Sequence, residues 1–155
     1  MAKKKQPKNI RAYMSHSIRA EHGNKATLAQ MNENCQLAVD FANQLRAYLM
    51  DWHRMDGLSL LELYVPGEND EFVQIAYKKG YLTEEEILEV DCAIIDKCNL
   101  LIVYGKYVSG GMKVEIDYCK NNNIPILHFM EYRGNRLPKD YQTALRAAIA
   151  FCITE

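Results

Sequence analysis

The stretch "NLLIVYG", Asn99–Gly105, contains an uninterrupted apolar run from Leu100 to Tyr104. A strand with one solvated face alternates apolar and polar residues, whereas a strand that is buried on both faces is apolar throughout. Strands buried on both faces are typical of parallel sheets that lie between two layers of helices. The stretch therefore predicts the central strand of an α/β sheet.

The segments on either side of this stretch alternate between strand and helix patterns. Apolar residues at i, i+3, i+4 and i+7 spacing predict a long amphipathic helix over 27–52. Thr83 followed by Glu86 has the spacing of a capping box and predicts a helix start there. The predicted strands are 10–14, 60–66, 99–105 and 124–130, and the other predicted helices are 68–80, 83–98, 109–123 and 137–152.

This alternation predicts one α/β domain over residues 9–155. Its sheet is expected to be doubly wound, flavodoxin-like or Rossmann-like, with four to five mainly parallel strands and helices on both faces. The basic opening "MAKKKQPK", residues 1–8, is expected to be a disordered tail. In such sheets ligands bind at the carboxyl ends of the strands, near the point where the strand order reverses.

Composition limits the kinds of partner that we expect. The 155 residues carry a formal charge of −1, so no global charge would attract a nucleic acid polymer or an anionic membrane. The chain shows neither a signal-peptide pattern nor an apolar run of membrane-spanning length, so we expect a cytoplasmic protein. Its five cysteines form an odd set without a C-x-x-C pair, which favours buried reduced thiols over a metal site or disulfides.

Two turns that follow predicted strands are candidate anion sites. The first is "AYMSHSIRAEHGN", Ala12–Asn24, which brings Ser15, His16, Ser17 and Arg19 close together just after the first strand. The second is "SGG", Ser109–Gly111, which enters a helix and would offer free backbone N–H groups. Each pattern also has an ordinary explanation, because strand ends are often polar and many turns use Ser and Gly for their geometry.

Two carboxylates and one phenol are candidates for chemistry near these turns. Glu115 would lie in the first or second turn of the helix after Ser109, where the helix dipole alone favours a carboxylate by about 0.3–1 kcal/mol. Asp91 lies beside the apolar face of the preceding helix, and Tyr13 lies on the first strand, from which it could orient a carboxylate. Paired carboxylates are the usual equipment for cleaving a glycosidic bond.

Taken together, these residues make the chain resemble the nucleoside 2-deoxyribosyltransferase superfamily, and within it the 2′-deoxynucleoside 5′-monophosphate N-glycosidases. The resemblance extends from "IRAYMSHSIR" to "NNNIPIL". It implies that Glu115 is the nucleophile, that Asp91 assists at the base or sugar, and that Tyr13 holds the nucleophile. It further implies that a phosphate-binding turn is formed by Ser17, Ile18 and Arg19, with Ser109 and Gly111 across from it.

Ser109 favours the monophosphate branch, because relatives that act on free nucleosides carry an Asp six residues before the nucleophile, where it would repel a phosphate. His16 departs from the pattern, since relatives have Gly before the Ser-Ile-Arg turn, and it is an additional candidate contact. The resemblance also implies a homodimer or higher homo-oligomer in which a neighbouring subunit completes the site. The candidates for that residue are Asn121, Asn123, Tyr132 and Arg133.

The expected activity is hydrolysis of the N-glycosidic bond of a (2′-deoxy)nucleoside 5′-monophosphate through a glycosyl-Glu115 intermediate, without a metal or cofactor. One alternative is a transferase that passes the sugar to a second base. Another is a nucleotide-binding or sensing module without turnover, and a third is an enzyme that cleaves NAD. The sequence leaves open the identity of the base and the choice between ribose and deoxyribose.

Overall fold

A computed structural model of the chain describes residues 9–56 and 61–154. The tail predicted for residues 1–8 lies outside the described residues. Within them, no helix combines the length and the apolar character needed to cross a membrane.

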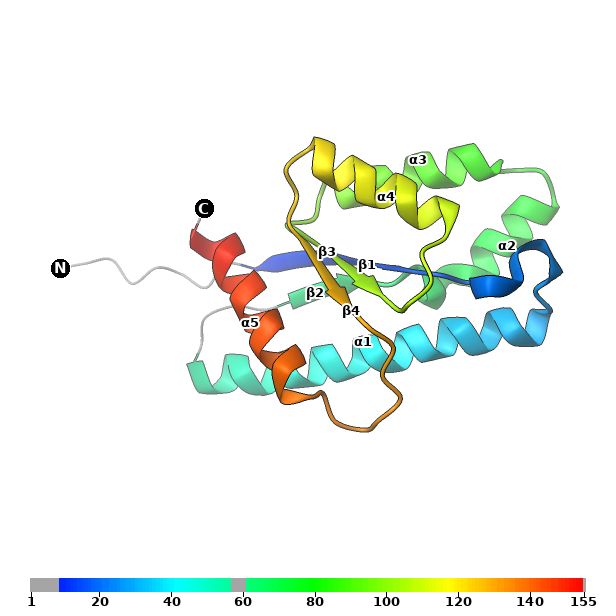
Figure 1. Ribbon diagram of the computed structural model, residues 1–155. Helices are drawn as coiled ribbons and strands as arrows, with labels where there is room; N and C mark the ends of the chain where they lie inside the picture. Colours follow the sequence, from blue (N-terminus) through cyan, green and yellow to red (C-terminus); the bar gives the residue numbers. More distant parts are fainter. Residues whose placement is uncertain (1–8, 57–60, 155) are drawn as a thin grey trace.

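Four parallel strands form one sheet in the order β2-β1-β3-β4 (Figure 1). They are β1 (Ile10–His16), β2 (Leu61–Tyr64), β3 (Leu100–Tyr104) and β4 (Ile126–Phe129). The chain moves from β1 outward to β2 and then returns to the other side of β1, so the strand order reverses between β1 and β3. The fold class predicted from the sequence is confirmed, with four strands, and the reversal marks the expected ligand crevice.

Helices cover both faces of the sheet (Figure 1). One layer consists of α1 (Leu28–Asp56) and α5 (Lys139–Thr154), and the other of α3 (Glu84–Ile95) and α4 (Gly110–Asn121). The shorter α2 (Asp70–Lys78) and two 3₁₀ turns, η1 (Ala20–Lys25) and η2 (Pro66–Asn69), lie in the connections. The capping box predicted at Thr83 and Glu86 is present at the start of α3.

The two cores divide the residues of β1 between them. Ile10, Ala12 and Met14 pack with α1 and α5, and Tyr13 packs with α3 and α4. All five residues of β3 are buried, as the apolar run predicts. Alternation along β1 therefore directs Tyr13 and Ser15 toward the α4 layer, and this places them on the same side as Glu115.

β1 is two residues longer than predicted, because Ser15 and His16 belong to the strand and not to a polar loop. Their Cα partners are Val103 and Tyr104 on β3, and both side chains are buried. The polar side chains suggested a loop, but tertiary contacts satisfy them inside the protein. The first helix is likewise longer than predicted and extends to Asp56.

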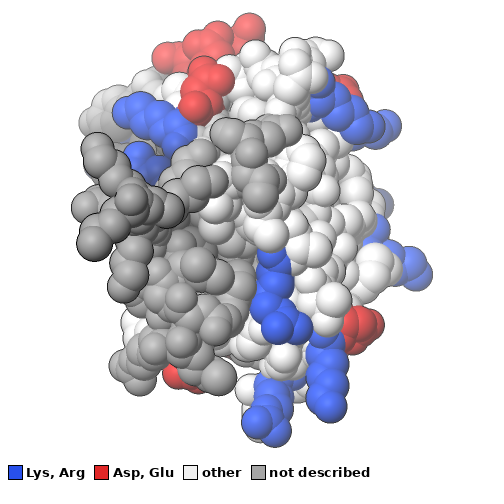
Figure 2. Space-filling view, turned by 90° about the vertical axis from the view of Figure 1, so that its left-hand side faces the viewer, with Lys and Arg blue, Asp and Glu red and all other residues white. Residues whose placement is uncertain are grey.

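The amino ends of the strands lie at the opposite end of the molecule from the crevice. Figure 2 shows this face, where Lys and Arg side chains are scattered around an uncharged area and acidic side chains gather at the top. The visible part of this face therefore presents no single field of one sign. This dispersed pattern agrees with the formal charge of −1.

Replacing Ile102 with Ala should test the two-sided burial of β3. Ile102 is fully buried, so the change should lower the free energy of unfolding by about 2–5 kcal/mol, which urea denaturation would measure. Val114→Ala on α4 is the control, because Val114 is exposed and its loss should change stability by less than about 1 kcal/mol. Equal effects of the two changes would contradict a central position for β3.

Candidate active site

Glu115 lies in the second turn of α4 and its carboxyl group is buried against β1. The helix begins at Ser109, whose Oγ accepts a hydrogen bond from Met112 N at 3.2 Å. Glu115 is only 6% exposed, and its Oε1 accepts a hydrogen bond from Ser15 Oγ at 3.0 Å. Its Oε2 has no hydrogen-bond partner among the described residues. A buried carboxylate oxygen without a hydrogen-bond partner costs free energy of folding, so this arrangement indicates that Glu115 has a role in function.

Tyr13 and Asp91 complete the surroundings of this carboxyl group. Tyr13 is fully buried, and its hydroxyl likewise lacks a partner of standard geometry within the described residues. Its ring stacks on Tyr64 of β2 with centroids 5.4 Å apart. Asp91 approaches from α3 and is partly buried. Three elements that are distant in sequence thus bring two carboxyls and a phenol together.

Burial raises the pKa of all three groups. It raises the pKa of Glu115 to about 7, and the negative charge of Asp91 adds to the rise while the hydroxyls of Tyr13 and Ser15 oppose it. It also raises the pKa of Asp91 to about 6, again opposed by Tyr13. The pKa of Tyr13 is raised by burial and by the neighbouring carboxylates. Near neutral pH the site therefore holds a neutral phenol and two carboxyl groups that can exchange protons with a ligand.

The turn after β1 is held by short-range hydrogen bonds. Ser17 Oγ accepts one from Ala20 N at 2.7 Å, and Asn34 Nδ2 donates one to Ile18 O at 2.9 Å. Arg19 donates to Asn24 Oδ1 at 3.1 Å and forms no ion pair with any described residue. Because Ser17 Oγ accepts from the backbone, its own proton stays available to an anion beside Arg19.

Ser109 offers the same chemistry from the start of α4, since its Oγ accepts from Met112 N and retains its proton for donation. A Cβ added to Gly110 would meet open space, and one added to Gly111 would come no closer than 3.5 Å to Leu88. Packing therefore does not require these glycines. Their effect is to leave the amino end of α4 uncovered, where its N–H groups favour an anion.

One cavity of about 400 Å³ is lined by all nine residues that the sequence suggested for catalysis, for the phosphate-binding turn or as an additional contact. These are Tyr13, His16, Ser17, Ile18, Arg19, Asp91, Ser109, Gly111 and Glu115. It lies at the carboxyl ends of β1 and β3, where ligands bind in sheets of this kind. Its volume falls in the usual range for small-molecule sites, about 300–1,000 Å³.

The sequence did not single out several other residues of the cavity wall. Pro66 and Gln74 come from η2 and α2, Glu84 from α3, and Tyr107 from the turn after β3. Tyr107 had a weak signal in the sequence, because it lies two residues beyond the end of the predicted central strand, 99–105. Gln74 had no such signal in the sequence, since its position in the cavity wall depends on how α2 packs against the site.

Of the four residues considered for completing a neighbouring subunit's site, two lie on the same edge as the cavity. Tyr132 and Arg133 follow β4, and Arg133 donates to Glu131 at 2.8 Å. Asn121 is the last residue of α4, at the end away from the cavity, and Asn123 follows two residues later. Arg133 also lines a neighbouring cavity of about 500 Å³, which shares His16, Ser17, Ala20 and Tyr107 with the first.

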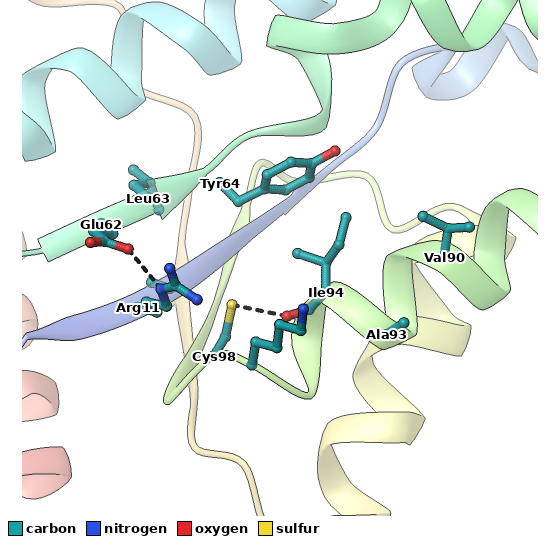
Figure 3. Close-up of a pocket in the computed structure, with 10 residues that line it drawn as sticks. Arg11, Glu62, Leu63, Tyr64, Val90, Ala93, Ile94 and Cys98 are labelled. Carbon is teal, nitrogen blue, oxygen red and sulfur yellow. Dashed lines mark hydrogen bonds and ion pairs between the residues drawn. The ribbon is translucent and has the colours of Figure 1, made fainter.

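A further cavity of about 470 Å³ is lined by residues of β1, β2 and α3, among them Tyr64 (Figure 3). Val90, Ile94 and Leu63 contribute much of its apolar lining, and an ion pair between Arg11 Nε and Glu62 Oε2 at 2.6 Å lies at its edge. None of the nine residues singled out from the sequence lines it. In the described part of the chain, no cluster of three or more His, Cys, Asp or Glu side chains could hold a metal ion.

Comparison with known proteins gave one match. A family model described as a domain of unknown function (DUF7768) matches residues 74–129, about a third of the chain. The matched segment contains Asp91, Ser109 and Glu115 but not the turn after β1. Searches among curated proteins and among solved structures found no significant match.

Glu115→Gln should stabilise the protein most at alkaline pH. The raised pKa means that the native state still holds a proton between pH 4.5 and 7 that the unfolded state has lost, so wild-type stability falls as pH rises through this range. Gln is neutral throughout, so its advantage in unfolding free energy should be roughly 2–3 kcal/mol larger at pH 8 than at pH 5.

Thermal or urea unfolding at the two pH values would measure this difference. Asp117→Asn is the matched control, because it also removes a carboxylate from α4 but at an exposed position. A Glu115→Gln effect that is independent of pH would contradict the buried, proton-binding carboxyl group.

Proposed function

We propose that this protein hydrolyses the N-glycosidic bond of a (2′-deoxy)nucleoside 5′-monophosphate. The observation that carries the proposal is the buried Glu115 carboxyl group, which accepts a hydrogen bond from Ser15 and lines one cavity with Asp91 and with the turn that contains Ser17 and Arg19. A nucleophile, an acid and a phosphate site at one sheet edge are the parts that this reaction requires. The sequence resemblance to monophosphate N-glycosidases supports the same assignment.

In the first step a Glu115 carboxylate oxygen attacks C1′ of the sugar as the C1′–N bond breaks. The electron pair of that bond goes to the base, which takes a proton from Asp91. The product is a glycosyl ester on Glu115. Burial raises the pKa of both carboxyl groups, to about 6 for Asp91 and about 7 for Glu115, so the pair can hold one proton between them near neutral pH. The reactive form is the one in which this proton lies on Asp91 and Glu115 is charged.

In the second step water attacks C1′ and the ester bond to Glu115 breaks. Asp91 accepts the proton of the attacking water, which restores the starting protonation state and releases the sugar 5-phosphate. Tyr13, kept neutral by burial, is suited to donate a hydrogen bond to the carboxylate of Glu115 and so keep it oriented.

The phosphate would be bound between the turn after β1 and the start of α4. Arg19 supplies a charge without a described ion-pair partner, and Ser17 and Ser109 supply hydroxyl protons. These contacts are remote from C1′, so their binding energy serves to fix the anomeric carbon in line with Glu115.

A transferase would share the first step and differ only in the acceptor. We expect a homo-oligomer in which a residue near the carboxyl edge, such as Tyr132 or Arg133, reaches a neighbouring site.

Glu115→Gln should abolish base release from deoxynucleoside monophosphates, with a loss of at least about 1,000-fold, because an amide cannot form the glycosyl ester. Chromatography of a panel of monophosphates, nucleosides and NAD would follow the released base. The matched control, Asp117→Asn, should retain full activity. Undiminished release by Glu115→Gln would rule out its role as nucleophile, and new nucleotides formed with an added base would favour the transferase.

Arg19→Met should raise KM for a monophosphate by about 10–100-fold, the usual value of a charge-assisted hydrogen bond, and should leave KM for the matching nucleoside nearly unchanged. Steady-state kinetics on both substrates would measure the two effects. Lys113→Met is the control, because Lys113 is an exposed cation on α4 away from the cavity. Equal changes of KM for both substrates would contradict a phosphate contact.

A further inference from the structure

His16 is a buried titratable residue of the cavity wall that the proposed mechanism does not use. It is only 7% exposed and stands directly before the Ser17–Ala20 turn. The resemblance to N-glycosidases predicts Gly at this position, so an imidazole here is a feature of this chain in its own right.

The imidazole joins β1 to the turn that follows β2. His16 Nε2 accepts a hydrogen bond from Gly67 N at 2.9 Å. Because Nε2 accepts, the ring proton must be on Nδ1, which lies 3.5 Å from Ser17 O. Burial lowers the pKa of His16 to about 4, although the neighbouring Ser17 carbonyl and Asp70 oppose this, so the ring is neutral and keeps its acceptor near pH 7.

The imidazole of His16 packs closely against the backbone of Gly67. A Cβ added to Gly67 would lie 3.0 Å from His16 Cε1, 3.1 Å from His16 Nε2 and 3.3 Å from Cys35 Cβ. Gly67 does not have a positive φ, so its backbone conformation does not require glycine. A side chain at this position would require the imidazole and Cys35 to shift by a few tenths of an ångström, and the absence of a Cβ avoids this.

Both segments that this contact joins form walls of the candidate active site. Ser17, Arg19 and Ala20 line it on one side, and Pro66, next to Gly67, lines it on the other. The turn also contains Ala20 at φ +51°, a conformation that costs a non-glycine residue free energy of the order of 1 kcal/mol. Such a turn keeps its shape only when the surrounding contacts hold it.

We infer that His16 is a positioning residue, which fixes the Ser17–Ala20 turn by its hydrogen bond to Gly67 so that Ser17 and Arg19 are pre-arranged for a phosphate group. The inference rests on the proposed function, because it assigns the turn to phosphate. His16 itself then needs no contact with the ligand. It acts by reducing the ordering that the turn must undergo when the anion binds.

Two variants of equal side-chain length separate the hydrogen bond from simple filling of space. His16→Gln keeps an oxygen acceptor near the position of Nε2, and His16→Met replaces it with a weakly accepting thioether. The probe is 2-deoxyribose 5-phosphate, which carries no base, and calorimetry at pH 7.5 would measure its dissociation constant. His16→Met should weaken binding about tenfold or more, while His16→Gln should stay within about threefold of wild type.

NMR would test the joint without any ligand. The ¹⁵N shifts of His16 should show a neutral ring with its proton on Nδ1, and the Gly67 amide should exchange slowly with solvent in wild type and in His16→Gln but quickly in His16→Met. A ring protonated on Nε2, or a Gly67 amide that exchanges equally fast in all three proteins, would overturn the inference.

The binding results also distinguish the two proposals. If wild type binds the probe and both variants bind it equally well, the role of His16 is wrong and the phosphate site stands. If wild type does not bind the probe at all, the proposed function is wrong and the inference about His16 is overturned with it. Thermal unfolding of the unliganded variants would confirm that each is folded at the temperature of the measurement.

Discussion

The hydrogen bond between Ser15 Oγ and Glu115 Oε1 is the interaction on which the candidate active site depends. It joins residues that are 100 positions apart and connects the central strand β1 to α4. The bond requires β1 to continue to Ser15. It also requires Ser109 to cap α4, so that Glu115 falls in the second turn of the helix on the face toward the sheet. The position of this one carboxyl group therefore depends on the order of the strands, on the length of β1 and on where α4 starts.

The same arrangement carries an energetic cost. Glu115 Oε2 and Tyr13 Oη are buried without a partner of standard geometry among the described residues, and the nearby Asp91 raises the pKa of Glu115 further. A chain selected only for stability would remove these groups or pair them fully. The stacking of Tyr13 on Tyr64 and the apolar cores on both faces of the sheet offset this cost.

Much of the architecture could be predicted because it depends on local patterns. The apolar run of β3 indicated a strand buried on both faces, and Thr83 with Glu86 indicated the start of α3. Most of the nine candidate residues were expected at one sheet edge because they follow a predicted strand or lie in the first turns of a helix, whereas Tyr13 lies within a strand and Asp91 within a helix. The end of β1 was not predicted, because Ser15 and His16 are polar and their burial depends on Glu115 and Gly67, which are distant in sequence. Gln74 of α2 was missed for the same reason.

The contact between His16 and Gly67 has a consequence for how this sequence can evolve. With the imidazole present, a Cβ at position 67 would come within 3.0–3.3 Å of His16 and Cys35, so a side chain there requires these neighbours to shift by a few tenths of an ångström. A smaller residue at position 16 would remove the two shorter contacts and lower this cost. Among homologous chains the two positions should therefore covary, with residues larger than glycine at position 67 favoured where the residue at position 16 is small.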